Sequence, residues 1–590
     1  MFRKNDQHLQ WPLFGSIDSL PPKQQQRLES SWAGAFYHEY FCRIDEEPFA
    51  VLYSDDEASR PNTPVNVLVS FETLKAGFGW SDEETYDHFC FDLQVRYAVG
   101  CRDLSAGHFE LRTVYNFRQR VTRHMQETGE NLFEQCFEQV ADGQVSAFKV
   151  KTNKLRMDST LIASNIRETT RLQLLVEVLQ RVHRMLDEAD QRRYAQEFEP
   201  YLKGSSGQYV YRLKGEDIAE HLRGVGELMH RLVEELPAPY RRESGYQMLQ
   251  RVFQEHFKVT ESELCPKAGQ ELSASSLQSP DDWEATYRQK RGQDHRGYVT
   301  NLTETCHPEN DLQLIVKVQT EPNNTDDAAM LAEALPNLKE RTDVDQMNTD
   351  GGFNSPEVDE LMRQLRVEQV QSAIRGRQPP EDKLGLDDFF WETDDDGQPQ
   401  PSAAQLAGQV NVSCPHAQRV TVEPGRKLNR YAAPFDASLC ASCPFHDQCP
   451  THPLKRKSKR VLRFSQQELD LALRRQRSAQ ARTSGQNLRA AVEATVRSVK
   501  HPFGNAKVPV RGKPRVSMLM LGSAAMSNVR RIHRYLTDRK EAKKAEMLTQ
   551  KQSESSQQLP SVLLFASFLS HLQNALSKLV LFRPAWAYGF

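Results

Sequence analysis

The order of strand-like and helix-like stretches is the feature that most constrains this chain of 590 residues. FKVKTNKLRMDST at 148–160 alternates partially and predicts a strand running into Asp158. Helical spacing of apolar residues fills 166–255. Two strand patterns follow in GYVTNLTET and LQLIVKVQT, then a helix in DDAAMLAEAL and a short strand, VDQMNTD, ending at Asp350. This order predicts an α/β fold whose first strand is separated from the others by a helical insertion.

Local start signals support several of the predicted helices. Residues 64–125 have a helical pattern, and Ser81-Asp82-Glu83-Glu84 has the form of a capping box. Ser355-Pro356 combines a cap residue with proline at the first helical position, and VEQVQSAIRGR after it resembles one more strand. In the helix predicted within HFELRTVYNFRQRVTRHM, the basic residues available to lie against DNA are Arg112, Arg118, Arg120, Arg123 and His124.

The chain is long enough for several domains, because single cores stop growing at roughly 250–300 residues. We expect an α/β core with two insertions after a helical N-terminal domain. The predicted segments are a helical DNA-binding domain at 1–145, the first core strand at 146–165, a helical insertion at 166–294, core strands and helices at 295–380, an acidic linker with a Cys-rich insertion at 381–464, a basic helical part of the core at 465–535, and a C-terminal tail at 536–590.

Charge is distributed unevenly behind a net charge of −3. Residues 451–516 contain 17 Lys and Arg but three acids, whereas 381–396 contain eight acids. Such a basic block neutralises phosphates and attracts polyanions through counterion release, although a charge run is also typical of a solvated face. No run of 18 apolar residues occurs, and polar residues interrupt 561–582, which favours an amphipathic helix. Ten cysteines without a secretory signal indicate a reducing cytoplasm.

Three acids are the candidate catalytic residues. Asp158 and Asp350 stand at the predicted ends of two strands, where carboxylates form the oxygen-rich site that Mg²⁺ or Mn²⁺ prefers. In QNLRAAVEATVRSVK, Arg489, Glu493 and Lys500 share one face of a helix. Glu493 is the only acid between Asp470 and Asp538, so a carboxylate in this basic field requires a reason. The alternative is an ordinary amphipathic helix with an i,i+4 ion pair.

Cysteines form a second candidate site. Cys440, Cys443 and Cys449 lie close together in sequence, and Cys414 precedes them. Four thiolates can hold zinc tetrahedrally, and the same spacing also suits an iron–sulfur cluster. His446 and His452 are alternative ligands, and reduced structural thiols are the alternative interpretation.

The motifs together resemble a known family. Arg489-x3-Glu493-x6-Lys500 resembles the end of the Tyr-Arg-Glu-Lys signature of DDE transposases from bacterial insertion sequences, although Gln486 stands where the family has tyrosine. The similarity includes the DST context of Asp158, NLTET, DDAAML, TDGGF, IRGR, HPFGNAKVPVRGKPRV and AAMSNVRRIHRYL. SFETLKAGFGWSDEETYDHFCFDLQVRYAVG is similar to the helical N-terminal domain of one branch, and Cys runs of this kind recur in that branch. The similarity spans about residues 60–535.

The resemblance implies an RNase H-like α/β catalytic core with two insertions, preceded by a helical N-terminal domain. It also implies a transposase that binds terminal inverted repeats and catalyses Mg²⁺-dependent strand cleavage and strand transfer. Asp158, Asp350 and Glu493 are the expected ligands of two Mg²⁺ (or Mn²⁺) ions. Double-stranded DNA, both transposon ends and target, is the expected partner, with contacts from Arg489, Arg497, Lys500 and Arg511. We expect a homo-oligomer assembled on the DNA ends in the cytoplasm, associated with the nucleoid, and no membrane contact.

Two other functions use the same features. An RNase H-like nuclease that cleaves without joining strands needs the same carboxylates. A zinc-dependent DNA-binding protein descended from an inactive transposase explains the cysteines, but intact Asp158, Asp350 and Glu493 argue against it.

Overall fold

The computed structural model describes residues 1–579 except 10–14, 55, 57, 59, 105–106, 237, 261–262, 375–379, 381, 394–409, 455–457 and 484–487. The chain forms two compact units, one ending at Arg530 and one beginning at Arg531. The predicted sites all fall in the first unit. No helix within the described residues is long and apolar enough to span a membrane.

The N-terminal part is helical, as predicted. Its helices are α1 (Pro22–Glu29), α2 (Trp32–Glu39), α3 (Val65–Phe78), α4 (Asp82–Phe91), α5 (Leu93–Ala98), α6 (Leu111–Thr128) and α7 (Leu132–Phe148). The predicted capping box is present: Ser81 Oγ accepts from the Glu84 amide, and the Glu84 carboxylate accepts from the Ser81 amide. Reciprocal bonds of this kind satisfy amides that the first helical turn leaves without partners.

Arg118 on α6 corrects one expectation, because it does not face DNA. Its guanidinium is buried and donates to Glu72 at 2.6 Å and to Asp82 at 2.7 Å. Both acids lie far earlier in the chain, so the α6 sequence alone gave no sign of them. Arg112, Arg120 and Arg123 on the same helix are exposed.

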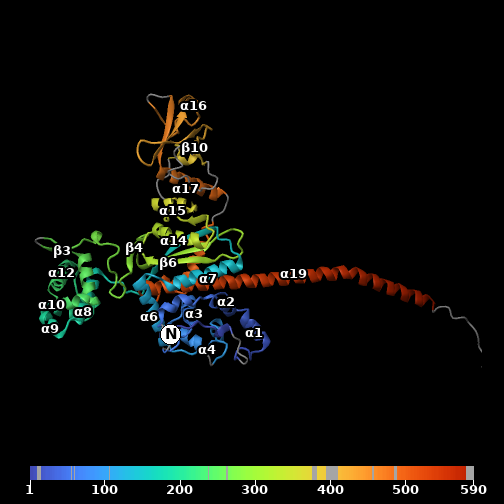
Figure 1. The fold of residues 1–590 in the computed structure, drawn as a ribbon, viewed down its shortest axis with the longest axis horizontal. Coiled ribbons are helices and arrows are strands. Elements are labelled where there is room, and N and C mark those ends of the chain that lie inside the picture. The colour runs from blue at the N-terminus through green and yellow to red at the C-terminus, as the bar shows by residue number, and fades with distance from the viewer. Residues whose placement is uncertain are drawn as a thin grey trace, which may run out of the picture. The chain divides into compact units, whose positions relative to one another are not determined.

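A six-stranded mixed sheet forms the centre of the first unit (Figure 1). Its strands are β1 (Lys154–Ala163), β4 (Thr286–Lys290), β5 (Gln293–Thr305), β6 (Ile315–Pro322), β7 (Gln346–Thr349) and β8 (Glu368–Gln371). β5 pairs antiparallel with β1 and β6, whereas β7 runs parallel to β1 and β8 parallel to β7. The strand order is therefore β6-β5-β1-β7-β8, with β4 as an extra strand on β5.

The two faces of the sheet are covered by different helices. Leu155 and Met157 of β1 pack into a core with α14 (Asp327–Arg341) and α15 (Pro356–Leu365). Ile162 packs instead with the N-terminal helices, in the same core as Val499. Because alternate residues of a strand point to opposite faces, β1 separates these two cores. Ser355 caps α15 as predicted, accepting from the Val358 amide.

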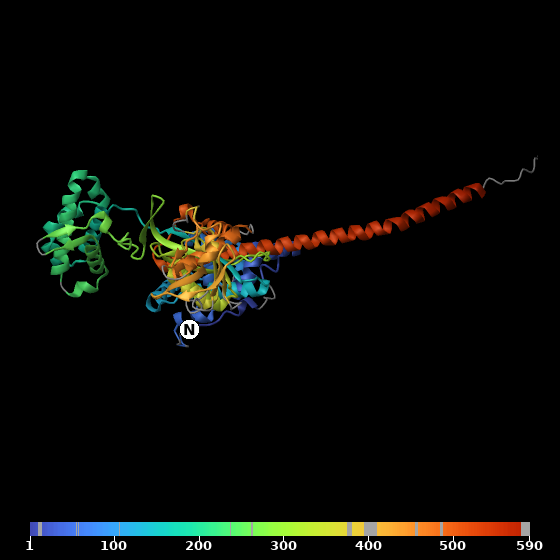
Figure 2. The same cartoon turned by 90° about the horizontal axis from the view of Figure 1, so that it is seen from above.

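The insertion between β1 and β5 is helical, with additional short strands. It contains α8 (Arg171–Met185), α9 (Glu188–Arg193), α10 (Ala195–Leu202), α11 (Ser206–Tyr211), α12 (Ile218–Glu235), α13 (Ser244–His256), β2 (Phe257–Val259) and β3 (Leu264–Pro266). Figures 1 and 2 both show the green helices of this segment side by side as a bundle. Its apolar faces form a core of their own.

The second insertion contains strands that sequence patterning did not predict. One sheet has the order β11-β10-β9 and the other β12-β13-β15-β14. The elements are β9 (Phe390–Thr393), β10 (Val410–Ser413), β11 (Arg419–Thr421), β12 (Glu423–Pro424), β13 (Arg430–Asp436), α16 (Ala437–Ala441), β14 (His452–Pro453) and β15 (Lys459–Ser465). These strands are short, and several are interrupted by proline or arginine, so their period is weak.

The basic region is not one continuous helix. It contains α17 (Gln466–Thr483), α18 (Val492–Lys500) and the start of α19 (Lys513–Leu579). α19 packs Val516, Leu519 and Met520 into the core shared with the N-terminal helices. The helix predicted at 561–582 is the final part of α19 as far as Leu579. Gln486, at the family's tyrosine position, lies outside the described residues.

Candidate active site

One face of β1 carries the candidate site. Arg156, Asp158 and Thr160 alternate with Leu155 and Met157 and therefore project from the same side of the strand. Each contacts the segment that contains α18. Arg156 donates to the Leu488 carbonyl at 2.7 Å, Asp158 accepts from Arg489 at 3.1 Å, and Thr160 Oγ1 accepts from Lys500 Nζ at 3.0 Å.

The structure places Asp158 in the middle of β1, whereas the sequence predicted it at the end of the strand. The partial alternation before Asp158 marks the start of the strand, but the strand continues through Ala163 because β5 pairs with it along that length. Asp350 lies where predicted, directly after β7. β7 is the parallel neighbour of β1, and this pairing brings the two aspartates together.

Arg489 joins the two aspartates. Its guanidinium lies 3.1 Å from Asp158 Oδ1 and 3.9 Å from Asp350 Oδ2, and it also donates to Ser372 Oγ at 3.3 Å. Asp350 Oδ1 accepts from the Gly352 amide at 2.7 Å, which fixes the turn after β7. The carboxylates of two strands thus share one cation.

Electrostatics follow from this geometry. Burial raises the pKa of Asp158 above its ordinary value, Arg489 opposes the rise, and the negative charge of Asp350 adds to it. Two carboxylates this close repel each other unless a cation lies between them. The pair is therefore suited to a bound cation, and hard oxygen ligands fit a divalent ion that keeps several waters.

Glu493 is the second residue of α18 and is exposed. Its side chain makes no hydrogen bond or ion pair with any described residue. Within the described residues, no group of three or more His, Cys, Asp or Glu is arranged to hold a metal. Asp158, Asp350 and Arg489 are therefore brought together, whereas the position of Glu493 as third ligand stays a prediction.

Arg489 also departs from the predicted helix face. α18 begins at Val492, so Arg489 lies in the turn before the helix and not one turn below Glu493. Its ionic contacts are the carboxylates of Asp158 and Asp350, although the sequence suggested phosphates. Ser372 and Thr160 were missed as neighbours of the site. Thr160 could have been found, because it lies two residues after Asp158 on the same strand.

The other predicted DNA contacts differ in exposure. Arg497 on α18 is exposed. Burial lowers the pKa of Lys500, and the charge of Lys290 lowers it further. Arg511 is partly engaged, since it donates to the Asn165 carbonyl at 2.6 Å and lies 3.2 Å from Asp281.

Three of the four cysteines of the predicted metal site, Cys414, Cys440 and Cys449, lie against the same hydrophobic core. Gln418 donates to both Cys414 Sγ at 3.3 Å and Cys440 Sγ at 3.5 Å. Burial raises the pKa of Cys440, and the thiols of Cys449 and Cys414 add to this rise. Among the residues that the structure describes, these thiols do not form a metal-holding group, so neither zinc nor an iron–sulfur cluster is supported.

Comparison with known proteins adds the family. Residues 413–533 match the family model described as a transposase DDE domain. The match includes α17, α18 and the start of α19, and therefore Arg489, Glu493 and Lys500. No curated protein and no solved structure is significantly similar to the chain. The match supports a DDE transposase, and the mixed α/β sheet that follows a helical N-terminal part fits an RNase H-like core.

Proposed function

We propose that this chain is the transposase of an insertion sequence, which binds the terminal inverted repeats, cuts the DNA there and joins the cut end to a target. One observation carries the proposal. Asp158 and Asp350, from neighbouring strands, share one cation on the face of the sheet covered by the family-matched segment. Two carboxylates this close together supply oxygen ligands of the kind that metal-dependent phosphoryl transfer uses.

The residues present fit a divalent cation. Transposase DDE domains generally use such ions, and Asp158 and Asp350 supply oxygen ligands. Glu493 is our proposed third ligand, because it is exposed at the start of the helix whose flanking residues contact Asp158 and Thr160. When bound, Mg²⁺ neutralises charge on the scissile phosphate and activates the attacking oxygen.

The proposed reaction is two in-line displacements at phosphorus. In the first, the oxygen of water attacks, the bond from phosphorus to the 3′-oxygen breaks, and that oxygen leaves as a 3′-hydroxyl. In the second, this 3′-hydroxyl attacks a target phosphate, and the target's own 3′-oxygen leaves with a proton. The chain contributes positioning and charge stabilisation, so no covalent protein intermediate is needed.

Basic residues beside the carboxylates bind the DNA backbone in this proposal. Lys500 and Lys290 are like charges near each other, and a phosphate between them relieves their repulsion. Arg497 is exposed on the same helix as Lys500. The N-terminal segment 1–145 adds the exposed Arg112, Arg120 and Arg123 of α6. We further propose that copies of the chain assemble on the two DNA ends.

Glu493→Gln tests the catalytic assignment. The substitution removes one negative charge from an exposed side chain, so DNA binding is expected to stay within about threefold of the wild-type value, whereas Mg²⁺-dependent cleavage of an inverted-repeat duplex falls at least about a hundredfold. Glu423→Gln is the matched control, because Glu423 is an exposed glutamate on β12 within the same matched segment. Cleavage by purified Glu493→Gln protein at the control's rate would overturn the assignment.

Joining is tested separately from cutting. A pre-cut duplex with a free 3′-hydroxyl is incubated with target plasmid and Mg²⁺. The proposal predicts a covalent product linking the duplex to the target. Cleavage of intact ends without any joined product would reduce the function to that of a nuclease.

A further inference from the structure

A buried charge pair lies beside the candidate site. Glu304 on β5 is fully buried, and its carboxylate accepts from Arg156 Nε at 2.7 Å. The two residues are directly opposite in the β1–β5 register. Arg156 precedes Asp158 by two positions, so both project from the same face of β1.

This pair holds the segment that carries Arg489 and Glu493. Arg156 donates a second bond to the Leu488 carbonyl at 2.7 Å. Thr495 Oγ1 lies 2.8 Å and 2.7 Å from the two oxygens of Glu304. Leu488 directly precedes Arg489, and Thr495 follows Glu493 by two residues. Both ends of 488–495 are therefore bound to one charge pair on the sheet.

Within this segment, the side chain of Arg489 contacts Asp158, Asp350 and Ser372. Residues 488–491 form a turn, and the residue before α18, Ala491, provides no side-chain cap. The amides of Val492 and Ala494 donate to the carbonyls of Arg489 and Ala491, which lie in this same turn. A helix start that is held only by its own turn is free to fray. The start of α18 thus depends on contacts from outside the helix.

Stability alone is a weak reason for this arrangement. A buried ion pair loses hydration on folding, and apolar side chains of similar size are often equally stable. Charge-assisted hydrogen bonds are directional, so a buried charged pair fixes the orientation of the groups that bond to it. The pair of Arg156 and Glu304 is therefore suited to fixing the position of residues 488–495.

We infer that Arg156, Glu304 and Thr495 are positioning residues, which set Arg489 and Glu493 at a fixed distance from Asp158. This inference rests on the proposed function, because it assigns to these residues the placement of the proposed third ligand. None of the three has to contact DNA or a reacting atom. Their effect is transmitted through residues 488–495.

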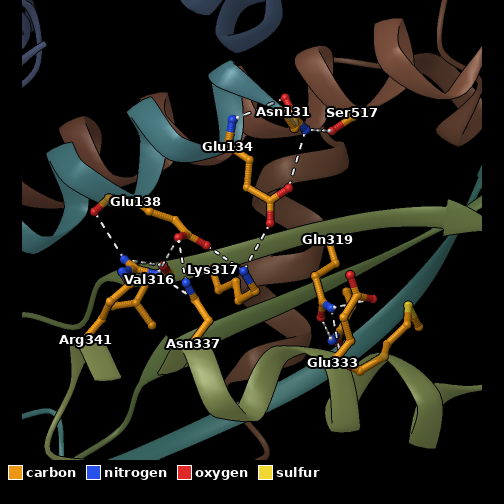
Figure 3. Close-up of polar contacts among 12 residues, drawn as sticks. Asn131, Glu134, Glu138, Val316, Lys317, Gln319, Glu333, Asn337, Arg341 and Ser517 are labelled. Carbon is orange, nitrogen blue, oxygen red and sulfur yellow. Dashed lines mark hydrogen bonds and ion pairs between the residues drawn. The ribbon is translucent and has the colours of Figure 1, made fainter. Parts of the chain in front are cut away.

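Figure 3 shows a second buried charge cluster on the same sheet that provides a control. Glu138 on α7 accepts from Lys317 of β6 at 2.6 Å and lies 3.2 Å from Arg341, the last residue of α14. These residues hold α7 against β6. Glu138→Gln therefore removes a buried carboxylate charge from the sheet's contacts without altering the partners of 488–495.

The first test compares Thr495→Val with Thr495→Ser. Valine keeps the shape and removes the hydroxyl, whereas serine keeps the hydroxyl. We expect hydrogen exchange of the amides in 492–500, measured in metal-free protein, to accelerate at least about tenfold in the valine variant and to stay near wild type in the serine variant. Exchange in α7 should be unchanged in both.

Cleavage gives the second readout. Because small misplacements of catalytic groups reduce rates strongly, Thr495→Val should cut at least about tenfold more slowly and need more Mg²⁺ for half-maximal rate, while DNA binding is retained. Thr495→Ser should restore both values. Equal exchange and equal cleavage in the two variants would overturn the inference.

A second variant covers the case in which Thr495→Val does not fold. Glu304→Gln, compared with Glu138→Gln at matched melting temperature, should lose protection of 492–500 and cleavage, and the control should lose neither. If both variants lost protection and cleavage in proportion to their fall in melting temperature, the role of Glu304 would be structural and the positioning role would be refuted. These results distinguish the inference from the proposed function. A fully active Glu493→Gln protein contradicts the proposed function. If Glu493→Gln is inactive and Glu304→Gln is fully active, only the positioning role is contradicted.

Discussion

Arg489 is the residue whose surroundings most change the expected chemistry. The sequence places it beside Glu493 as a phosphate contact, whereas the structure places its guanidinium against Asp158 and Asp350. An arginine there acts as a counter-ion to both carboxylates. A metal ion and Arg489 therefore compete for the negative charge of the same two carboxylates.

Arg489→Gln should consequently tighten metal binding while it weakens catalysis. Removing the competing charge is expected to improve the affinity for Mn²⁺ in DNA-free protein by about tenfold, or about 1.4 kcal/mol. Calorimetric titration measures this. Arg482→Gln is the control, because Arg482 donates to the nearby Ser372 carbonyl at 3.2 Å. Unchanged or weaker Mn²⁺ binding by the Arg489 variant would contradict the competition.

Contacts between individual side chains were the hardest feature to predict from the sequence. That Asp158 and Asp350 share a site was expected from the family resemblance, and the strand pairing supplies its geometry. The bridge by Arg489 could not be expected, since it depends on a turn that interrupts the predicted helix. Arg118 was assigned to the surface because its partner Glu72 is distant in sequence.

Among the elements, α13 has an unusual terminal residue. His256 is 3% exposed, and neither ring nitrogen has a hydrogen-bond partner among the described residues. Burial, together with the smaller effect of the positive charges of Arg171 and Lys267, lowers its pKa to about 4. The folded insertion therefore holds this ring neutral.

The stability of the helical insertion should fall in mild acid. Between about pH 6.5 and pH 4 the unfolded segment binds a proton at His256 that the folded segment does not, so stability decreases as the pH falls. The loss is roughly 2 kcal/mol at pH 5. Hydrogen exchange of α8 and α13 at pH 7 and pH 5, corrected for intrinsic rates, measures it. His256→Leu should remove most of this difference, and an undiminished difference would contradict the assignment.

Elements were predicted well where local signals agreed. The capping box at Ser81 and the Ser355-Pro356 start both mark true helix starts, because their bonds are local. The succession of strands and helices along the chain from β1 to β8 also followed from patterning, apart from β2, β3 and β4 within the insertion. β9 to β15 were not predicted, because they are short and pair across loops, and the end of β1 was misplaced because pairing with β5 extends it.

At the scale of the whole molecule, the candidate site is assembled from distant parts of the chain. Asp158 and Asp350 lie outside the family-matched residues 413–533, and Glu493 lies within them. The insertions after β1 and after β8 add sequence without separating these strands, because β1 and β7 remain neighbours in the sheet. The long spacing between the acids is thus compatible with one site.

If Asp158 and Asp350 hold a divalent metal for DNA cleavage, changing the ligand atom at Asp158 should change which metal ion supports cleavage. Sulfur is a poor ligand for Mg²⁺ but an acceptable one for Mn²⁺, so Asp158→Cys should lose cleavage of an inverted-repeat duplex in Mg²⁺ and regain a substantial part of it in Mn²⁺. Asp158→Ala should stay inactive in both metals. An Asp158→Cys protein that is equally active in the two metals, or that Mn²⁺ does not restore beyond the alanine variant, would contradict the claim.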